Sequence, residues 1–417
     1  MSTILIYTSP ARGHLYPMMD VSIALRESGH RVVVQTLASE RDVVLAEGIE
    51  HRAISPEIEA LDIQDYLGSN PLKQFQLAME CWLSRAPHEV KDLRTAVAEL
   101  HPDLLVIDAN SWGASAYAAA QPQPWAMFLP YALPVPSPDT PAFGPGFAPP
   151  RNWLDRQRDR LVWAVQNAST RKYLKKLNAL RAQTGAAPLR RTQDIFQQAD
   201  LLLYLTAEPF EYPRADWPEM VEPIGPGLWA PPGQVPDWLQ DMPRPRVLVS
   251  VSTEFQEDGA IIETALAALA GEPGSLIVTT AAIDPEKFSA PNDRVRITRF
   301  LPHAQVIPKM DVVVTHGGMG TTQRSLAEGV PVCVVPWGRD QSESARRAVQ
   351  SGAGTMVPRS KLDSTRLREA VREASLRTSG AQQVAQAFRA AGGGARGASL
   401  LEGLIARSER DPQSVSD

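Results

Sequence analysis

Cysteine, long apolar runs and an excess of charge of one sign are scarce or absent in this 417-residue chain. Its two cysteines, Cys81 and Cys333, lie in different halves of the sequence, and a lone distant pair makes neither a disulfide framework nor a zinc site. This usage favours a reducing compartment, so we expect a cytoplasmic protein. The 42 basic and 47 acidic residues are mixed along the chain and give a net charge of -5. The absence of a large field of one sign argues against a nucleic-acid partner.

The apolar runs are short and end at glycine, proline or a charged residue. None approaches the roughly 20 residues that span a bilayer, so we expect no membrane span. Met1 is followed almost at once by the strand-like run Ile4-Leu5-Ile6-Tyr7. This start lacks the basic region, long apolar block and cleavage site of a signal peptide, and nothing in it indicates export.

Short apolar runs alternate with segments of helical periodicity in both halves of the chain. In the first half we expect strands at 4–7, 31–35 and 104–107, and helices at 17–28, 40–47 and 87–100. In the second half we expect strands at 247–251, 275–279, 295–298, 312–315 and 332–336. This alternation is typical of β-α-β units with parallel sheets. Because the chain is too long for one ordinary core, we predict an α/β protein with two doubly wound, Rossmann-like domains.

Two segments rich in proline and glycine interrupt this rhythm. Residues 133–150 cannot form a helix or a central strand, because proline lacks the amide donor. We expect a surface loop there, which serves either as a lid or pocket wall or as a loose tether. Residues 213–245 are the expected linker between a first domain, 1–212, and a second, 246–391. Residues 392–417 are expected to form a last helix that returns to the first domain.

A glycine-rich loop, His316-Gly317-Gly318-Met319-Gly320-Thr321-Thr322, connects the strand at 312–315 to a helix. Backbone N–H groups at a helix N-terminus lack partners within the helix, and glycines let a phosphate approach them closely. The hydroxyls of Thr321 and Thr322 add further donors. The loop therefore predicts a diphosphate site that needs no lysine. A tight turn that merely packs the helix on the sheet is the plainer alternative.

A dinucleotide-binding loop of an oxidoreductase is a third interpretation. Asp340 follows Gly320 by 20 residues, at the end of the strand at 332–336, where a ribose-binding acid would stand. However, Gln323 occupies the place of the third glycine in the Gly-x-Gly-x-x-Gly pattern. The adjacent His316 is also not required for dinucleotide binding.

Several motifs together resemble one large family. They are the loop from His316, then Leu326-Ala-Glu-Gly-Val-Pro-Val, Pro336-Trp-Gly-Arg-Asp-Gln, Ser344-Ala-Arg-Arg, the N-terminal Ser9-Pro-Ala-Arg-Gly-His14-Leu-Tyr-Pro17 and Val249-Ser-Val-Ser-Thr253. This set resembles the inverting glycosyltransferases that act on macrolides, polyketides and plant phenolics, in antibiotic and other secondary metabolism. The resemblance covers nearly the whole chain.

The resemblance implies the GT-B fold, in which two Rossmann-like domains face each other across a cleft. The acceptor would bind in the N-terminal domain and a nucleotide diphosphate sugar in the C-terminal domain. His316 and the amides of residues 317–321 would hold the diphosphate with Thr253, Phe300 would stack on the base, and Asp340 and Gln341 would grip the sugar. The donor-site residues implied in this way are Thr253, Phe300, His316, Gly317, Gly318, Gly320, Thr321, Arg324, Trp337, Asp340 and Gln341.

Inverting transfer of a sugar requires a base that takes the acceptor's proton, and histidine titrates near neutral pH. His14 is placed for this role, and Asp108 is the candidate to orient its ring and stabilise its charged form. The helix N-terminus and His316 would stabilise the leaving diphosphate. We therefore expect no metal and no cofactor besides the sugar donor, and the chain has no Asp-x-Asp pair. Alternatively, His14 is an ordinary loop histidine and Asp108 caps a helix beginning near Ser111.

Arg324 departs from the family pattern, which has a glutamate there to bond the ribose hydroxyls. Arginine only donates hydrogen bonds and cannot replace that carboxylate. The usual uridine nucleotide is therefore in doubt, and a dTDP- or UDP-sugar donor is expected. Ser252 is a second departure, where the family usually has glycine.

Aromatic residues of the first domain suggest an apolar acceptor pocket. They are Trp82, Trp112, Phe128, Tyr131 and Phe143, although Trp112 and the donor-side Trp337 could equally be packing residues. We predict a small hydrophobic acceptor, such as a macrolide, polyketide or aromatic aglycone, and a monomer or homodimer. The alternative function is a non-catalytic nucleotide-sugar-binding partner of another glycosyltransferase.

Overall fold

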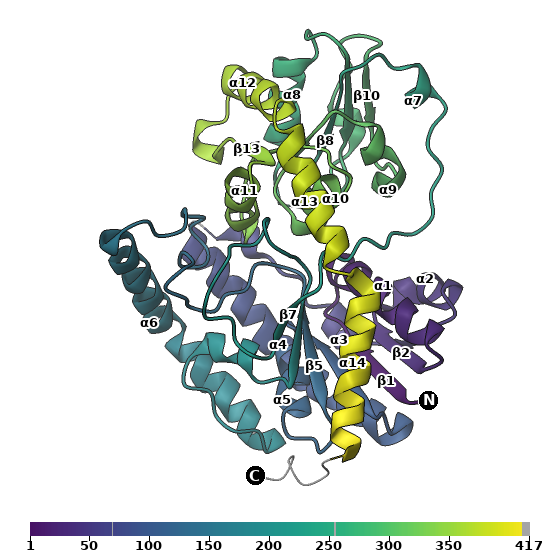
Figure 1. Ribbon diagram of the computed structural model, residues 1–417, viewed down its shortest axis with the longest axis vertical. Helices are drawn as coiled ribbons and strands as arrows, with labels where there is room; N and C mark the ends of the chain where they lie inside the picture. The colour runs from purple at the N-terminus through teal and green to yellow at the C-terminus, as the bar shows by residue number, and fades with distance from the viewer. Residues whose placement is uncertain (69, 254–255, 411–417) are drawn as a thin grey trace.

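The computed structural model describes residues 1–68, 70–253 and 256–410, which form the two α/β domains of Figure 1. In these ranges one parallel sheet has the order β3-β2-β1-β4-β5-β6-β7 and the other the order β10-β9-β8-β11-β12-β13. The strands of the first sheet are β1 (Thr3–Tyr7), β2 (Arg31–Thr36), β3 (Glu50–Ala53), β4 (Leu104–Asp108), β5 (Trp125–Leu129), β6 (Leu201–Tyr204) and β7 (Val221–Pro223). Those of the second are β8 (Arg246–Ser250), β9 (Ser275–Thr279), β10 (Val295–Thr298), β11 (Val312–Thr315), β12 (Val332–Val334) and β13 (Gly354–Met356).

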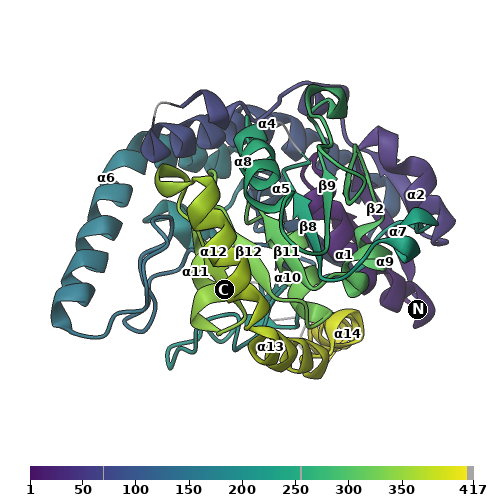
Figure 2. The same cartoon turned by 90° about the horizontal axis from the view of Figure 1, so that it is seen from above.

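Helices cover both sheets. The first domain has α1 (Arg12–Glu27), α2 (Arg41–Ala46), α3 (Pro56–Glu59), α4 (Pro71–Leu100), α5 (Trp112–Ala118) and α6 (Trp153–Thr184). The remaining helices are α7 (Trp238–Asp241), α8 (Gly259–Leu269), α9 (His303–Val306), α10 (Met319–Ala327), α11 (Gln341–Gln350), α12 (Ser364–Ser375), α13 (Thr378–Ala390) and α14 (Gly393–Arg410). Helix α6 stands at the outer side of the first domain in both views (Figures 1 and 2).

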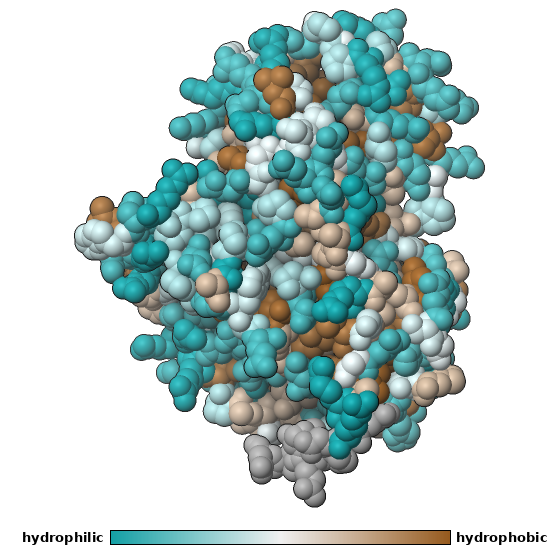
Figure 3. Space-filling model, in the orientation of Figure 1, coloured by the Kyte–Doolittle hydropathy of each residue, from teal (hydrophilic) through white to brown (hydrophobic). Residues whose placement is uncertain are grey.

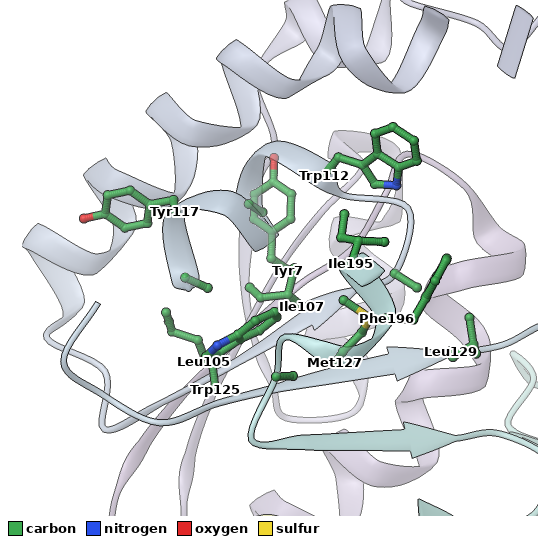
Figure 4. Close-up of a cluster of buried hydrophobic side chains, with 14 of the residues drawn as sticks. Tyr7, Leu105, Ile107, Trp112, Tyr117, Trp125, Met127, Leu129, Ile195 and Phe196 are labelled. Carbon is green, nitrogen blue, oxygen red and sulfur yellow. The ribbon is translucent and has the colours of Figure 1, made fainter. Parts of the chain in front are cut away.

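The first sheet is buried on both faces, because successive side chains of a strand point to opposite sides. Leu5 and Tyr7 of β1 face the core formed with α4 and α5, where Trp112 and Trp125 also pack (Figure 4). Ile4 and Ile6 face the opposite core, which α1 and α14 cover. This double burial explains why the strands read as continuous apolar runs in the sequence.

The strand order reverses between β1 and β4 in the first sheet and between β8 and β11 in the second. Tyr7 pairs with Ile107, and Ser250 pairs with Thr315, so that the carboxyl ends of each pair lie side by side. Ligands of open α/β sheets bind beside such reversals. His14, Asp108, Thr253 and His316 lie at the carboxyl ends of these four strands or within a few residues beyond them.

The proline-rich segment 133–150 packs between the domains. Leu133, Val135 and Ala142 are buried, and the N–H groups of Gly144 and Gly146 donate to Glu343 of α11, over 2.8 and 3.1 Å. This contact favours the interpretation as a pocket wall over that as a loose tether.

The segment 213–245 is only partly a linker, because β7 lies inside it and pairs with β6. The first sheet thus extends into the segment predicted to connect the domains. At the other end of the chain, α13 lies on the second domain and α14 runs along the first (Figure 1). Leu401 of α14 packs with Leu15 and Met18 of α1. Residues 411–417 of the predicted returning segment lie outside the described residues.

The face of the molecule in Figure 3 is mainly hydrophilic, with small and separate apolar areas. Among the described residues, no helix combines the length and the apolar character that a membrane span needs.

The packing of α5 on α4 leaves no room for a side chain at Gly113. A Cβ atom there would lie 1.9 Å from the carbonyl oxygen of Ala86. We expect Gly113→Ala to lower the free energy of unfolding by about 3 kcal/mol, because a backbone carbonyl of α4 has to move. Urea denaturation measures this loss. Gly271→Ala is the control, since its Cβ would meet nothing within 4 Å; equal stability of both variants would contradict the predicted packing.

Candidate active site

A cavity of about 1290 Å³ lies between the two domains. The first domain lines it with the loops after β1 and β4, part of α4 and part of α6, and the second with the loops after β8, β11 and β12. Both groups of sequence-predicted residues meet here: His14 on one side, and Thr253, His316 and Asp340 on the other.

His14 lies in the first turn of α1, which begins five residues earlier than the predicted helix. Its ring nitrogen Nδ1 lies 3.0 Å from Oδ1 and 2.9 Å from Oδ2 of Asp108, the last residue of β4. The side chain of Asp108 is fully buried, whereas 17% of the His14 side chain is exposed. The pair therefore has an inner carboxylate and an outer imidazole that faces the cavity.

Asp108 remains ionised despite its burial. Burial by itself would raise its pKa, but the charge and hydrogen bond of His14 and the amides of Asn110 and Ser9 lower the pKa below the usual value. These amides donate over 2.9 Å each, and the Ser9 hydroxyl adds a third donor at 2.7 Å. A carboxylate with this many donors holds the imidazole in one orientation. The capping role considered for Asp108 is not needed to explain these contacts.

Asn110 is a site residue that the sequence analysis missed. Its side-chain Nδ2 lies 3.3 Å from Nε2 of His14, and its Oδ1 accepts a hydrogen bond from the Tyr131 hydroxyl at 2.8 Å. Asn110 thus contacts the nitrogen of His14 that is turned away from Asp108. Its position two residues beyond Asp108, near the carboxyl end of a strand, is the sequence feature from which Asn110 could have been predicted as a site residue.

The glycine-rich loop opens α10 as predicted, and its backbone leaves no space for side chains at two points. Gly317 has a φ of +100°, a conformation that favours glycine. A Cβ atom on Gly318 would lie 2.7 Å from Nε2 of His316. The hydroxyl of Ser344 donates to the carbonyl oxygen of Gly317 and fixes the loop on α11. The first turn of α10 therefore presents its N–H groups to the cavity beside His316.

His316 is buried and neutral at pH 7. Burial lowers the pKa of its ring, the Ser250 carbonyl partly opposes this shift, the charge of Arg339 adds to it, and the resulting pKa is about 4. Its Nδ1 has no hydrogen-bond partner among the described residues. A neutral ring can offer a hydrogen bond to a phosphate without requiring a counter-ion.

Asp340 and Gln341 lie at the start of α11, but their side chains have different surroundings. Burial raises the pKa of Asp340, and the charges of Arg339 and His14 offset only part of this rise. Asp340 thus faces the first domain across the cavity. The Oε1 atom of Gln341 accepts from the amides of Trp337 and Gly338, at 2.7 and 2.9 Å. Its Nε2 donates to Gln256 at 2.8 Å, so Gln341 shapes the loop that carries Asp340.

Arg339 joins the second domain to the first at the rim of the cavity. It donates from two nitrogens to Asp65, over 2.8 and 3.1 Å. Asp65 starts a short 3-10 helix before α4 and is nearly buried. No sequence pattern indicated this pair, because its partners lie far apart in the chain.

Comparisons with known proteins identify the fold and the reaction class. Residues 263–392 match the C-terminal domain of the erythromycin biosynthesis protein CIII-like family. The 4'-demethylrebeccamycin synthase of Lentzea aerocolonigenes is 28% identical over 389 residues, which cover 88% of this chain and 90% of that protein. The calicheamicin glycosyltransferase CalG4 is 21% identical and superimposes with a TM-score of 0.75, over 98% of this chain and 99% of the other. The glycosyltransferase VinC, solved in complex with dTDP, is 20% identical with a TM-score of 0.69, over 97% and 100%.

The chain is a GT-B glycosyltransferase. The predicted fold class and family resemblance are confirmed.

Most of the predicted donor residues of this glycosyltransferase line the cavity. They are Thr253, His316, Gly318, Gly320, Thr321, Trp337, Asp340 and Gln341. Gly317 is buried directly behind the loop. Phe300 and Arg324 lie outside the lining: Phe300 is 66% exposed, and Arg324 donates to the Trp229 carbonyl at 3.1 Å. Arg324 therefore contacts the interdomain segment.

Most of the predicted acceptor residues of the glycosyltransferase also line the cavity, and one does not. Trp82, Trp112, Tyr131 and Phe143 line the cavity. The prediction for Phe128 is wrong, because it is fully buried in the core under α1 and α14. It lies in β5 next to Met127, which packs on the opposite face, and strand alternation decides between the two faces. Phe75, Trp163 and Phe196 also line the cavity, and the sequence analysis did not identify them.

The contact between Gly318 and His316 predicts a loss of donor binding in Gly318→Ala. The added methyl group would displace the His316 ring, so the affinity for UDP and dTDP should fall at least about tenfold, which corresponds to about 1.4 kcal/mol. Isothermal titration calorimetry measures both affinities. Gly403→Ala on α14, where the nearest heavy atom would be 3.9 Å away, should bind as the wild type does. Unchanged binding in Gly318→Ala would show that the diphosphate lies elsewhere.

Proposed function

We propose that this glycosyltransferase transfers a sugar, with inversion and without a metal ion, from a nucleotide diphosphate donor to a hydroxyl group of a small hydrophobic acceptor. The observation that carries the proposal is the His14–Asp108 pair on one wall of the cavity, opposite Asp340 and the His316 loop. One wall provides a base and the other a diphosphate site. The aromatic side chains between them favour an apolar acceptor.

The acceptor hydroxyl approaches Nε2 of His14, while Nδ1–H donates to Asp108. As the hydroxyl oxygen attacks the anomeric carbon, its proton moves to Nε2 and Asp108 stabilises the imidazolium. The bond between the anomeric carbon and the diphosphate oxygen breaks on the opposite side, so the configuration inverts. In this scheme Asp340, on the wall formed by the second domain, binds a hydroxyl group of the sugar.

The leaving diphosphate gains negative charge as this bond breaks. The start of α10, Thr321 and neutral His316 all line the cavity, and in this scheme the free N–H groups, the Thr321 hydroxyl and the His316 ring donate to that charge. Oriented donors of this kind stabilise an oxyanion without reorganising. They take the place that a divalent ion occupies in enzymes with a metal-bridging carboxylate pair, which supports a metal-independent mechanism.

The proposed roles of His14 and Asp108 predict losses of kcat of different size when each residue is replaced. His14→Ala should lower kcat by about 10³-fold, because it removes the group that takes the acceptor's proton. Asp108→Asn should also lower kcat by about 10²-fold or more, since an amide no longer stabilises the charged ring. The affinity for UDP or dTDP should change less than about twofold in both variants, since the diphosphate site is on the other wall. Normal turnover in His14→Ala would rule out the mechanism.

The nucleotide is proposed to be thymidine diphosphate in preference to uridine diphosphate. Arg324 stands where the family pattern has the ribose-binding glutamate, and its side chain donates to Trp229. The first turns of α10 thus supply no carboxylate for a ribose 2'-hydroxyl. VinC, whose fold this chain shares, was solved with dTDP bound.

We expect dTDP to raise the melting temperature more than UDP at equal concentration, because the tighter ligand stabilises the folded chain more. Turnover assays with dTDP-glucose and UDP-glucose should show the same order, and EDTA should leave the rate unchanged. Activity with UDP-glucose alone would remove the thymidine proposal. Loss of activity in EDTA that returns with Mg²⁺ would remove the metal-independent mechanism.

A further inference from the structure

Arg85 places a buried positive charge on the acceptor wall of the cavity. It lies in the middle of α4, and only 5% of its surface is exposed. Arg85, Trp82 and Trp112 all line the cavity, and the rings of the two tryptophans lie 5.2 Å apart. The reaction proposed above uses none of these three side chains.

The neighbouring protein groups offset little of the positive charge of Arg85. One nitrogen of the guanidinium, Nη2, donates to the carbonyl oxygen of Leu61. The second nitrogen, Nε, is buried and has no hydrogen-bond acceptor among the described residues. The third, Nη1, also has no acceptor among these residues, but it is accessible to solvent. In the described part of the chain no carboxylate lies within 4.0 Å of the guanidinium. A buried charge without a counter-ion lowers the stability of the folded protein. The position of Arg85 beside a cavity therefore indicates that a ligand supplies the missing negative charge.

The nearby carboxyl groups do not fill this role. Glu89 lies one turn further along α4, and its Oε2 accepts from the Gly113 amide at 2.7 Å. Burial raises the pKa of Glu89, the Gly113 amide and the charge of Arg85 offset only part of this rise, and the resulting pKa is about 8, so Glu89 is mostly protonated at pH 7. Asp65 is already paired with Arg339. Asp62 follows Leu61 and lines the cavity, but it lies beyond ion-pair distance from Arg85.

We propose that Arg85 recognises a carboxylate on the acceptor, whose flat aromatic body lies against Trp82 and Trp112. A guanidinium is always charged and binds carboxylates through strong, directed hydrogen bonds, which a low-dielectric wall strengthens. The aromatic wall provides the apolar contact area. The inference rests on the proposed function in one respect, that this wall receives the acceptor. It names the class of acceptor: an aromatic hydroxy acid in place of a neutral aglycone.

The test uses two isosteric fluorescent probes, 6-hydroxy-2-naphthoate and 6-hydroxy-2-naphthamide, titrated into the full chain at pH 7. Their hydroxyl groups and ring systems are the same, and only the carboxylate carries a charge. The wild type should bind the naphthoate at least about tenfold more tightly than the amide, a typical effect of one buried charged hydrogen bond. Equal binding of the two probes by the wild type would overturn the proposal without any variant.

Substitutions then assign the preference to Arg85. Arg85→Met should bind both probes equally, with its affinity for the amide within about twofold of the wild type, and Arg85→Lys should retain part of the preference. Melting temperature and dTDP affinity verify that each variant is folded. A full preference for the naphthoate in Arg85→Met would overturn the proposal.

This experiment distinguishes a failure of the proposed acceptor binding from a failure of the proposed sugar transfer. Fluorescence detects binding without any sugar donor, so an absence of turnover with both probes would count against the proposed reaction and leave the role of Arg85 standing. Turnover of both probes with equal KM values would count against Arg85 and leave the proposed reaction standing.

Discussion

Arg347 of α11 is buried between two carboxylates, and the cleft depends on this arrangement. Its guanidinium donates to Glu211 of the first domain, over 2.8 to 3.1 Å, and to Glu343 of its own helix at 2.8 Å. Burial alone would lower the pKa of Arg347, but Glu211 and its other neighbours raise it well above the usual value. Loss of one partner from such a buried set typically costs about 3–5 kcal/mol. The network therefore holds α11, and Asp340 before it, against the first domain.

The same network determines how the two walls of the active site face each other. Glu343 also accepts the amides of Gly144 and Gly146, which fixes the proline-rich wall next to Phe143. Arg339 and Asp65 repeat the interdomain contact at the rim, and Gln323 of α10 donates to the Leu205 carbonyl. Each contact joins a strand-end loop of the second domain, or one of the first two turns of α10 or α11, to the first domain. His14 and the glycine-rich loop are thus held in fixed positions relative to each other by polar contacts that take no part in the proposed reaction.

Residues that follow strand ends were the most predictable part of the site. The His316 loop and Asp108 were identified because short apolar runs mark the strands, and parallel strands bring their carboxyl ends together, whereas His14 was identified through the family resemblance of the segment around it. Prediction was poorer for residues on helices and on strand faces. Phe128 was assigned to the pocket, although one step of alternation places it in the opposite core. Arg85 and Asn110 were missed, since a helix or loop residue becomes a pocket residue only through the packing of distant segments.

The sequence by itself determined the parallel α/β class with two domains, several strands of each sheet, the helix-opening glycine loop and, through the family motifs, the pair of residues suited to proton transfer. These features depend on local periodicity, on glycine and proline, and on chemistry at strand ends, all of which are encoded within a few residues. Only the tertiary structure decided that Arg324 turns to Trp229, that Gln341 holds a loop, and that Arg85 lines the cavity with no carboxylate of the described residues in ion-pair contact. Those outcomes depend on burial and on long-range partners, which no local pattern specifies.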